Sequence, residues 1–157
     1  RFETIRDIKR GVLYIVDYAH TPDALEKVLK TIHAMVTKQA SLISVVGCGG
    51  NRNGAKRLVM GGLAAKWSKE AIFTDDNPRK EDPVSITDAM QSGVAADDRE
   101  KVLIINDRKQ AIHTAFRLAK KGDIVLVAGK GHETYQEING VKHDFDDRKV
   151  IEDIIGN

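Results

Sequence analysis

The segment 73–79 combines residue types that could bind a charged small molecule. It reads Phe-Thr-Asp-Asp-Asn-Pro-Arg, so an apolar stretch ends in two carboxylates, an amide, a proline and an arginine. Pro78 fixes its own φ and disfavours a helical conformation at Asn77, which places Arg79 just beyond the end of a strand. Open α/β sheets bind ligands at that end of their strands, and a guanidinium group suits a carboxylate or a phosphate. The segment alone is equally compatible with a type I turn that carries a solvated arginine.

Five apolar stretches alternate with helical patterns along the chain. The stretches cover residues 12–16, 42–46, 71–73, 102–105 and 124–127. They are continuously apolar, which is typical of strands that are buried on both faces of a sheet. Between them, apolar residues recur at spacings of three and four, as in amphipathic helices. We therefore predict an α/β fold with a Rossmann-like, mostly parallel sheet of about six strands and helices on both faces.

Helix starts are marked by polar residues that precede proline. Thr21 before Pro22 and Asp82 before Pro83 each predict a capping side chain followed by proline at the first helical position. The apolar spacing after Pro22 continues to Val36, so the first helix is expected to reach that residue.

The C-terminal part of the chain follows a different pattern. Residues 134–138 and 141–145 flank Asn139-Gly140, a pair typical of tight hairpin turns, which predicts a β-hairpin. Asp146 or Asp147 is expected to cap a last helix.

Length and composition limit the functional classes. The 157 residues suit a single domain, 1–157, and the net charge of +2 with 5% aromatic residues argues against a nucleic-acid partner. The single cysteine, Cys48, excludes an internal disulfide and fits a reducing cytoplasm. We see neither a signal peptide nor an apolar run of the roughly 18 residues that cross a membrane. The first residue is Arg1, which suggests a piece of a longer polypeptide.

Charged and glycine-rich loops follow four of the five strands. Because the carboxyl ends of parallel strands share one edge, these loops are expected to lie side by side. They comprise residues 17–20, 47–52, 75–79 and 129–133. Each loop by itself has an equally good structural explanation as a cap or tight turn, but their coincidence at one edge predicts a binding cleft.

Several common motifs are absent or incomplete. Glycines from Gly49 to Gly54 have the spacing of a phosphate-binding loop, but Ala55 stands where lysine is required. Arg52 replaces the third glycine of the dinucleotide-binding fingerprint. The five histidines show no zinc spacing, so we predict no metal site in this chain. Cys48 has no evident histidine partner, although exposure on a glycine loop would leave open a reactive thiol. We predict a rim that holds ligands and contributes no catalytic residue.

The loops resemble, in this order, those of the C-terminal domain of the Mur ligase family, the ATP-dependent amino-acid ligases of peptidoglycan synthesis. The resemblance is carried by residues 17–23, 47–52, 76–79, 130–133 and 145–148. The tetrapeptide Asp-Asn-Pro-Arg at 76–79 resembles the recognition motif of members that add meso-diaminopimelate to UDP-N-acetylmuramoyl-L-alanyl-D-glutamate. In this family ATP phosphorylates a substrate carboxylate, and the incoming amine then attacks the acyl phosphate.

The resemblance implies that this chain is one half of a composite active site. A central ATPase domain with the phosphate loop and most Mg²⁺ ligands, and an N-terminal UDP-binding domain, would lie outside residues 1–157. ATP and Mg²⁺ would be cofactors of the full-length enzyme, and the isolated piece would be inactive. Its partners would be meso-diaminopimelate, ATP, the UDP-linked dipeptide and the central domain of the same polypeptide.

Individual roles also follow from the resemblance. The residues that would bind meso-diaminopimelate are Arg52, Asp76, Asn77, Pro78, Arg79, Gly129 and Glu133. The residues that would face ATP are Arg1, Asp17, Tyr18 and His20. Asp75 or Asp76 would orient Arg79 or its loop, because a carboxylate that faced a substrate carboxylate would repel it. Lys130 and His132 match the family motif, but the resemblance gives them no role.

The charges agree with such a ligand. Meso-diaminopimelate carries two carboxylates and two amines, whereas lysine lacks one of the carboxylates and would leave Arg79 unpaired. Three alternatives remain open: a related ligase that adds lysine or another amino acid, a non-catalytic nucleotide- or amino-acid-binding module, and a dinucleotide-binding domain. The incomplete fingerprint makes the last of these the weakest.

Overall fold

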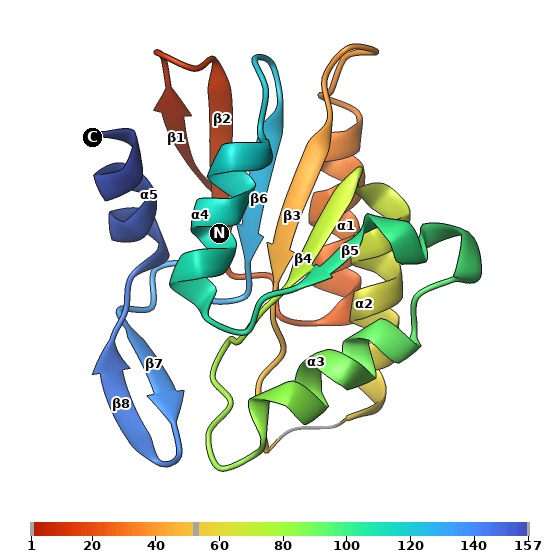
Figure 1. Ribbon diagram of the computed structural model, residues 1–157, viewed down its shortest axis with the longest axis vertical. Coiled ribbons are helices and arrows are strands. Elements are labelled where there is room, and N and C mark those ends of the chain that lie inside the picture. Colours follow the sequence, from red (N-terminus) through yellow and green to blue (C-terminus); the bar gives the residue numbers. More distant parts are fainter. Residues whose placement is uncertain (1, 52–53, 157) are drawn as a thin grey trace.

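The computed structural model describes residues 2–51 and 54–156 and shows a large sheet with helices on both faces (Figure 1). The six strands of this sheet are β1 (Glu3–Asp7), β2 (Val12–Asp17), β3 (Leu42–Val46), β4 (Glu70–Phe73), β5 (Val102–Ile104) and β6 (Ile124–Ala128). Their order is β1-β2-β6-β3-β4-β5. All neighbours pair in parallel except β1, which is antiparallel to β2. The predicted α/β class with a mostly parallel sheet is confirmed.

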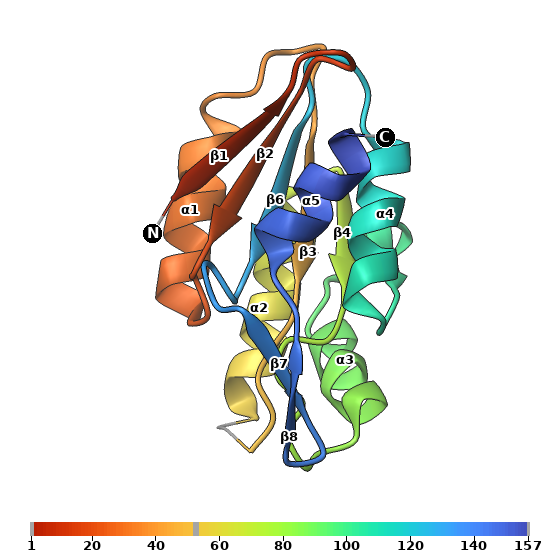
Figure 2. The ribbon, with the colours of Figure 1, turned by 90° about the vertical axis from the view of Figure 1, so that its left-hand side faces the viewer.

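Two apolar cores lie on opposite faces of the sheet. The helices are α1 (Pro22–His33), α2 (Ala55–Trp67), α3 (Pro83–Ser92), α4 (Arg108–Leu118) and α5 (Asp147–Ile155), with a short 3₁₀ helix at Ala96–Lys101. Residues of α1, α2 and α3 form one core, and residues of α4 and α5 form the other. Figure 2 shows the sheet edge-on, with α1 and α4 on opposite sides. Strands that are covered on both faces explain the continuously apolar stretches of the sequence.

The expected helix caps are present. The Thr21 side chain accepts a hydrogen bond from the Ala24 amide, and the Asp82 side chain accepts one from Val84. Both prolines occupy the first turn, where the missing N–H costs no hydrogen bond.

Two features of the N-terminal half differ from the expectation. The first helix does not reach Val36: it ends at His33, because the chain turns there to enter β3, and Val36 packs against the core from the turn. Strand β1 was not predicted, since it alternates polar and apolar residues and is only partly buried as an edge strand.

The predicted hairpin consists of β7 (Tyr135–Ile138) and β8 (Val141–Asp144), and it extends past the carboxyl edge of the large sheet (Figure 1). Asn139 and Gly140 both have positive φ, as a tight hairpin turn requires. Asp146 caps α5 by accepting hydrogen bonds from the amides of Arg148 and Lys149, whereas Asp147 is buried and serves another purpose. Within the described residues, no helix combines the length and the apolar character needed to cross a membrane.

Candidate functional site

A pocket of about 280 Å³ opens where β2, β3, β4 and β6 end. All four of the loops predicted to share this edge contribute to it. Its lining includes Tyr18 and His20, Cys48 and Gly49, Asp76, Asn77 and Arg79, and Gly129 and Glu133, together with Lys56, Arg57 and Met60 of α2. The topology therefore brings loops that are far apart in the sequence into one cavity.

The structure brings together most, but not all, of the predicted site residues. Pro78 and Asp17 do not line the pocket, and Arg1 and Arg52 lie outside the described residues. Pro78 is buried and acts through its backbone: a Cβ at Gly50 would stand 1.8 Å from the Pro78 carbonyl oxygen. Gly50 is therefore required for the glycine loop to approach the Asp-Asn-Pro-Arg loop, which it joins by a 2.8 Å bond from its amide to the Asn77 carbonyl.

The backbone of Arg79 is held by the hairpin. Its φ is +57°, a left-handed conformation that few non-glycine residues adopt. The Arg79 amide donates to the Glu137 carbonyl at 2.9 Å, and the Asn139 amide donates to the Arg79 carbonyl. These bonds form a parallel bridge to Ile138, so the hairpin fixes a strained position at the edge of the pocket.

The guanidinium of Arg79 is oriented by carbonyl groups. Its Nη1 donates to the carbonyl oxygens of Gly50 at 3.0 Å and Asn77 at 3.3 Å, and its Nε lies 3.8 Å from Glu137 Oε1. Of the two roles expected for Asp75 or Asp76, orienting Arg79 or orienting its loop, the contacts agree with the second. Asp75 holds the loop, because its Oδ1 accepts a 2.8 Å hydrogen bond from Asn106 Nδ2.

Asp76 is a buried carboxylate on the wall of the pocket. It is 7% exposed, and its Oδ1 has no hydrogen-bond partner among the described residues. Burial raises the pKa of Asp76, and the charges of Arg108 and Lys130 oppose that rise. A buried acceptor without a partner is costly unless a ligand donates to it.

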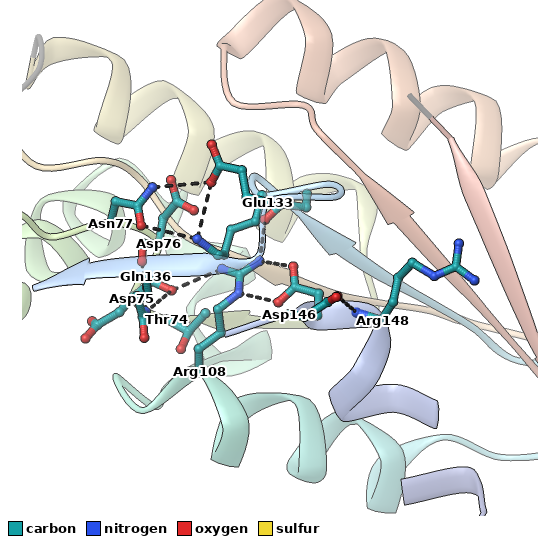
Figure 3. Close-up of polar contacts among 12 residues, drawn as sticks. Thr74, Asp75, Asp76, Asn77, Arg108, Glu133, Gln136, Asp146 and Arg148 are labelled. Carbon is teal, nitrogen blue, oxygen red and sulfur yellow. Dashed lines mark hydrogen bonds and ion pairs between the residues drawn. The ribbon is translucent and has the colours of Figure 1, made fainter. Parts of the chain in front are cut away.

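Asn77, Lys130 and Glu133 form a polar cluster beside Asp76 (Figure 3). Asn77 Nδ2 and Lys130 Nζ both lie 3.3 Å from Glu133 Oε1, and Lys130 Nζ also lies 3.2 Å from Asn77 Oδ1. Lys130 is fully buried, whereas His132 of the same loop is exposed and does not line the pocket. Two loops that carry the predicted site residues are thus joined side chain to side chain.

A buried ion pair that the sequence did not reveal supports these loops from below. Arg108 donates to both carboxylate oxygens of Asp147 at 2.8 Å, and both side chains are fully buried. The same guanidinium donates to the carbonyls of Asp75 at 3.0 Å and Ala128 at 3.1 Å (Figure 3). One arginine therefore ties the ends of β4 and β6 to α5. The sequence signal that could have indicated this ion pair was Asp147, the second aspartate of the 145–148 motif, because only one aspartate is needed to cap the helix.

A second arginine closes the side of the pocket next to α2. Arg57 donates to both carboxylate oxygens of Glu81, at 2.6 and 2.8 Å, and to the Gly49 carbonyl at 3.1 Å. Hydrogen bonds from Arg57 and from the Asn51 amide lower the pKa of Glu81 to about 2. Lys56 of the same helix lines the pocket and adds a positive charge. A lysine and an arginine directly after a glycine loop were the signal that could have indicated both residues.

Cys48 is buried, so the loop exposure that left open a reactive thiol is absent. It is 7% exposed and donates to the sulfur of Met60 at 3.7 Å. Burial, and then the charge of Asp76, raise the pKa of the Cys48 thiol to about 12. The thiol therefore stays protonated at neutral pH and serves as part of the pocket floor.

The Tyr18 side of the pocket is open to solvent. Tyr18 is 41% exposed, and its ring meets the His20 ring edge-on at 4.5 Å. His20 Nδ1 lies 2.8 Å from the Tyr18 carbonyl oxygen. The paired rings offer an aromatic surface at the mouth of a cavity whose interior is charged. Such an arrangement can bind a ligand with a flat end and a zwitterionic end.

The family model described as "Mur ligase, glutamate ligase domain" matches residues 1–131. A curated UDP-N-acetylmuramoyl-L-alanyl-D-glutamate--2,6-diaminopimelate ligase from Bacteroides thetaiotaomicron is 56% identical over 154 residues, which are 98% of this chain and 32% of the relative. A ligase of the same name from Clostridioides difficile is 48% identical over 99% of this chain and 31% of its own length. This chain thus spans about a third of the length of the curated relatives it matches.

Solved structures agree with the sequence relatives. A structure with the same ligase name superposes with a TM-score of 0.90 and 46% identity over 99% of this chain and 31% of that one. A folylpolyglutamate synthase from Mycobacterium tuberculosis shares the fold with a TM-score of 0.59 at 15% identity, over 81% of this chain and 28% of that one.

Proposed function

Because this chain belongs to the Mur ligase family, we propose that it is the amino-acid-binding domain of a ligase that adds meso-diaminopimelate to UDP-N-acetylmuramoyl-L-alanyl-D-glutamate. The ligase would act in peptidoglycan synthesis in the cytoplasm. The remaining two thirds of the enzyme would supply the central ATPase domain and the UDP-binding domain. The proposal extends to this chain the activity that the names of its relatives state.

One observation carries the choice of amino acid. The pocket presents hydrogen-bond donors from Arg79 and Asn77 next to acceptors from Asp76 and Glu133. A guanidinium with a neighbouring amide suits a carboxylate, and a carboxylate suits an ammonium group. One end of meso-diaminopimelate carries both groups on a single carbon, whereas the side-chain end of lysine carries only an amine. In our proposal, Arg52 and the backbone at Gly129 complete the contacts to this ligand.

The chain's part in the reaction would be to position the attacking amine. With one end of the amino acid held between Arg79 and Glu133, the amine at the other end would point out of the pocket. ATP, with Mg²⁺ held mostly by the central domain, would supply the phosphoryl group that converts the D-glutamate carboxylate to an acyl phosphate. The amine nitrogen would then form the amide bond as phosphate leaves, and the overall change would be ATP to ADP and phosphate.

The nucleotide would lie against the Tyr18 side of the pocket. The exposed rings of Tyr18 and His20 fit an adenine base, because flat aromatic surfaces stack on nucleobases. We assign Asp17 to the ribose and Arg1 to ATP from the resemblance to the family. Residues 1–157 contribute no catalytic group in this scheme, so the chain alone is expected not to hydrolyse ATP.

The test is an amino-acid selection assay with the full-length enzyme. Purified ligase is incubated with ATP, Mg²⁺ and the UDP-linked dipeptide, together with meso-diaminopimelate, lysine or no amino acid. Phosphate release and the mass of the product are measured. We expect a product with meso-diaminopimelate and a kcat/KM for lysine that is lower by roughly 10⁴, because lysine has no second carboxylate to offer to the Arg79 guanidinium. Equal use of lysine would favour the related lysine-adding ligase, and no product with either would favour a non-catalytic binding module.

A further inference from the structure

Lys130 is a fully buried lysine directly behind the wall of the pocket. Lysine is almost never fully buried unless its charge is paired. Its Nζ donates to Asn77 Oδ1 at 3.2 Å and to Glu133 Oε1 at 3.3 Å, and lies 5.3 Å from the centre of the Tyr135 ring. The ammonium group does not line the cavity, so its influence on a ligand must pass through the side chains that it holds.

The first of these side chains is Asn77. Its Oδ1 accepts from Lys130 Nζ and from the Glu137 amide at 2.9 Å. An amide oxygen has two lone pairs, so both are occupied. A rotated amide would place its NH₂ group against two donors, which fixes Nδ2 on the side of Glu133 and the pocket (Figure 3). Asn77 is thereby set to donate to a ligand and not to accept from it.

The second is Glu133. Among residues 2–51 and 54–156, the hydrogen bonds to its carboxylate come from Asn77 Nδ2 and Lys130 Nζ, and both end on Oε1. Within this described part of the chain, Oε2 is left to accept from a ligand, on a side chain that is 22% exposed. The charge of Lys130 also opposes the repulsion between Glu133 and the buried Asp76 on the adjoining wall. A buried cation therefore allows two carboxylates to line one small pocket.

We propose that Lys130 is a positioning residue for amino-acid recognition: it sets Asn77 as the donor for a ligand carboxylate and Glu133 as the acceptor for a ligand ammonium group. The inference rests on the proposed function of the pocket and goes further by naming how its hydrogen-bond polarity is established. The ligand class is an amino-acid end that carries both charged groups on one carbon.

The decisive variant is Lys130→Met in the full-length ligase, because methionine fills a similar volume without the charge. We expect the KM for meso-diaminopimelate to rise by about 10- to 100-fold, the effect of losing one or two charge-assisted hydrogen bonds. The kcat is expected to change by less than about threefold, and the KM for ATP to stay the same, since a positioning effect is confined to the amino acid. A folded variant with an unchanged KM for the amino acid, or with equal rises for ATP and the amino acid, overturns the proposal.

A double-mutant cycle separates positioning from general destabilisation. If Lys130 acts in part through Glu133, the losses of Lys130→Met and Glu133→Gln should combine to less than their product, and the loss that Lys130→Met still causes in the Glu133→Gln background should be the part that passes through Asn77. Multiplicative losses contradict the proposal. If Lys130→Met fails to fold, Lys130→Gln, which keeps a donor without the charge, should still raise the KM for the amino acid above that of the parent enzyme. A KM equal to that of the parent enzyme contradicts the proposal.

Lys142 offers a matched control. Its Nζ lies 4.5 Å from the centre of the same Tyr135 ring, but it is on the exposed strand β8 and forms none of the bonds to Asn77 or Glu133. Lys142→Met is expected to leave the KM unchanged, and an equal rise in both variants would assign the effect to Tyr135. If the parent enzyme proves to add lysine, the proposed function fails, whereas the Lys130 effect is still measured with the amino acid that the enzyme accepts.

Discussion

The two sides of the pocket are built differently. On the amino-acid side, formed by residues 75–79 and 129–133, polar and charged side chains are buried or partly buried, bonded to one another and supported by the hairpin and the Arg108–Asp147 pair. On the Tyr18 side, two exposed rings contact each other at the surface. The first side is organised before any ligand arrives, so little ordering cost is left for binding. The Tyr18 side is open to solvent. It would therefore suit a nucleotide that becomes enclosed only when another domain covers it.

Among the variants considered, substitution of Arg79 should have the largest effect on amino-acid selection, and so on the difference between the two sides of the pocket. Arg79→Ala is expected to lower the ratio of kcat/KM for meso-diaminopimelate over lysine by roughly 10²–10⁴, because it removes the guanidinium to which only meso-diaminopimelate offers a second carboxylate. Arg79→Lys should recover only part of the ratio, since an ammonium group cannot bind a carboxylate bidentately. Ligation of both amino acids by each full-length variant gives the measurement. An unchanged preference would refute the role of Arg79.

The contribution of the Arg108–Asp147 ion pair to the amino-acid side can be tested by measuring the free energy of unfolding. Arg108→Met leaves Asp147 buried without its partner, which typically costs about 3–5 kcal/mol. Arg148→Met provides the comparison, because its ion pair with Glu3 is partly exposed and such pairs contribute at most about 1 kcal/mol. Urea unfolding followed by circular dichroism measures both variants. Similar losses for the two would show that the buried pair does not support the fold.

Cys48, in the pocket floor between the two sides, should react slowly with thiol reagents. Because the pKa of Cys48 is raised to about 12, its thiolate is scarce at neutral pH, and we expect reaction with an aromatic disulfide to be about 10²-fold slower than in urea. The sign for stability follows from the same shift. Above the ordinary pKa of 9.0 the unfolded chain loses the thiol proton and the folded chain keeps it, so the stabilisation present below pH 9 declines up to about pH 12. A Cys48→Ala variant should lose this part of the pH dependence, and rapid labelling of the folded protein would contradict the burial.

The open side should show the smallest effect. Tyr18→Ala removes one exposed ring and is expected to raise the KM for ATP by about 5- to 10-fold, the effect of one stacking contact, while the preference for meso-diaminopimelate persists. Steady-state kinetics with varied ATP measure the change in KM for ATP, and kinetics with varied amino acid measure the preference for meso-diaminopimelate. A change of amino-acid preference in Tyr18→Ala would remove the distinction between the two sides.

The sequence allowed the architecture to be predicted where local physics decides it. Continuous apolar strands, capped helices and the Asn139-Gly140 turn each carry a local signal, and the parallel sheet then places four loops at one edge. The central place of β6 and the edge strand β1 carry no such signal, because strand order depends on pairing between distant segments.

Within the site, the contributing loops were predictable but their internal support was not. Lys130 lies in a polar glycine loop, where a lysine is ordinarily solvated, but in the structure it is fully buried with its ammonium group near the Tyr135 ring of the hairpin. The positive φ of Arg79 likewise depends on a bridge to a hairpin nearly 60 residues further along the chain. Tertiary contacts thus turn recognisable loops into an ordered pocket.

The most direct test is a crystal structure of the full-length ligase with meso-diaminopimelate bound. The account predicts one carboxylate of the ligand against the Arg79 guanidinium and Asn77 Nδ2, with the ammonium group of the same carbon at Glu133 Oε2. A ligand that occupies the enzyme without contacting Arg79 and Glu133 would contradict it.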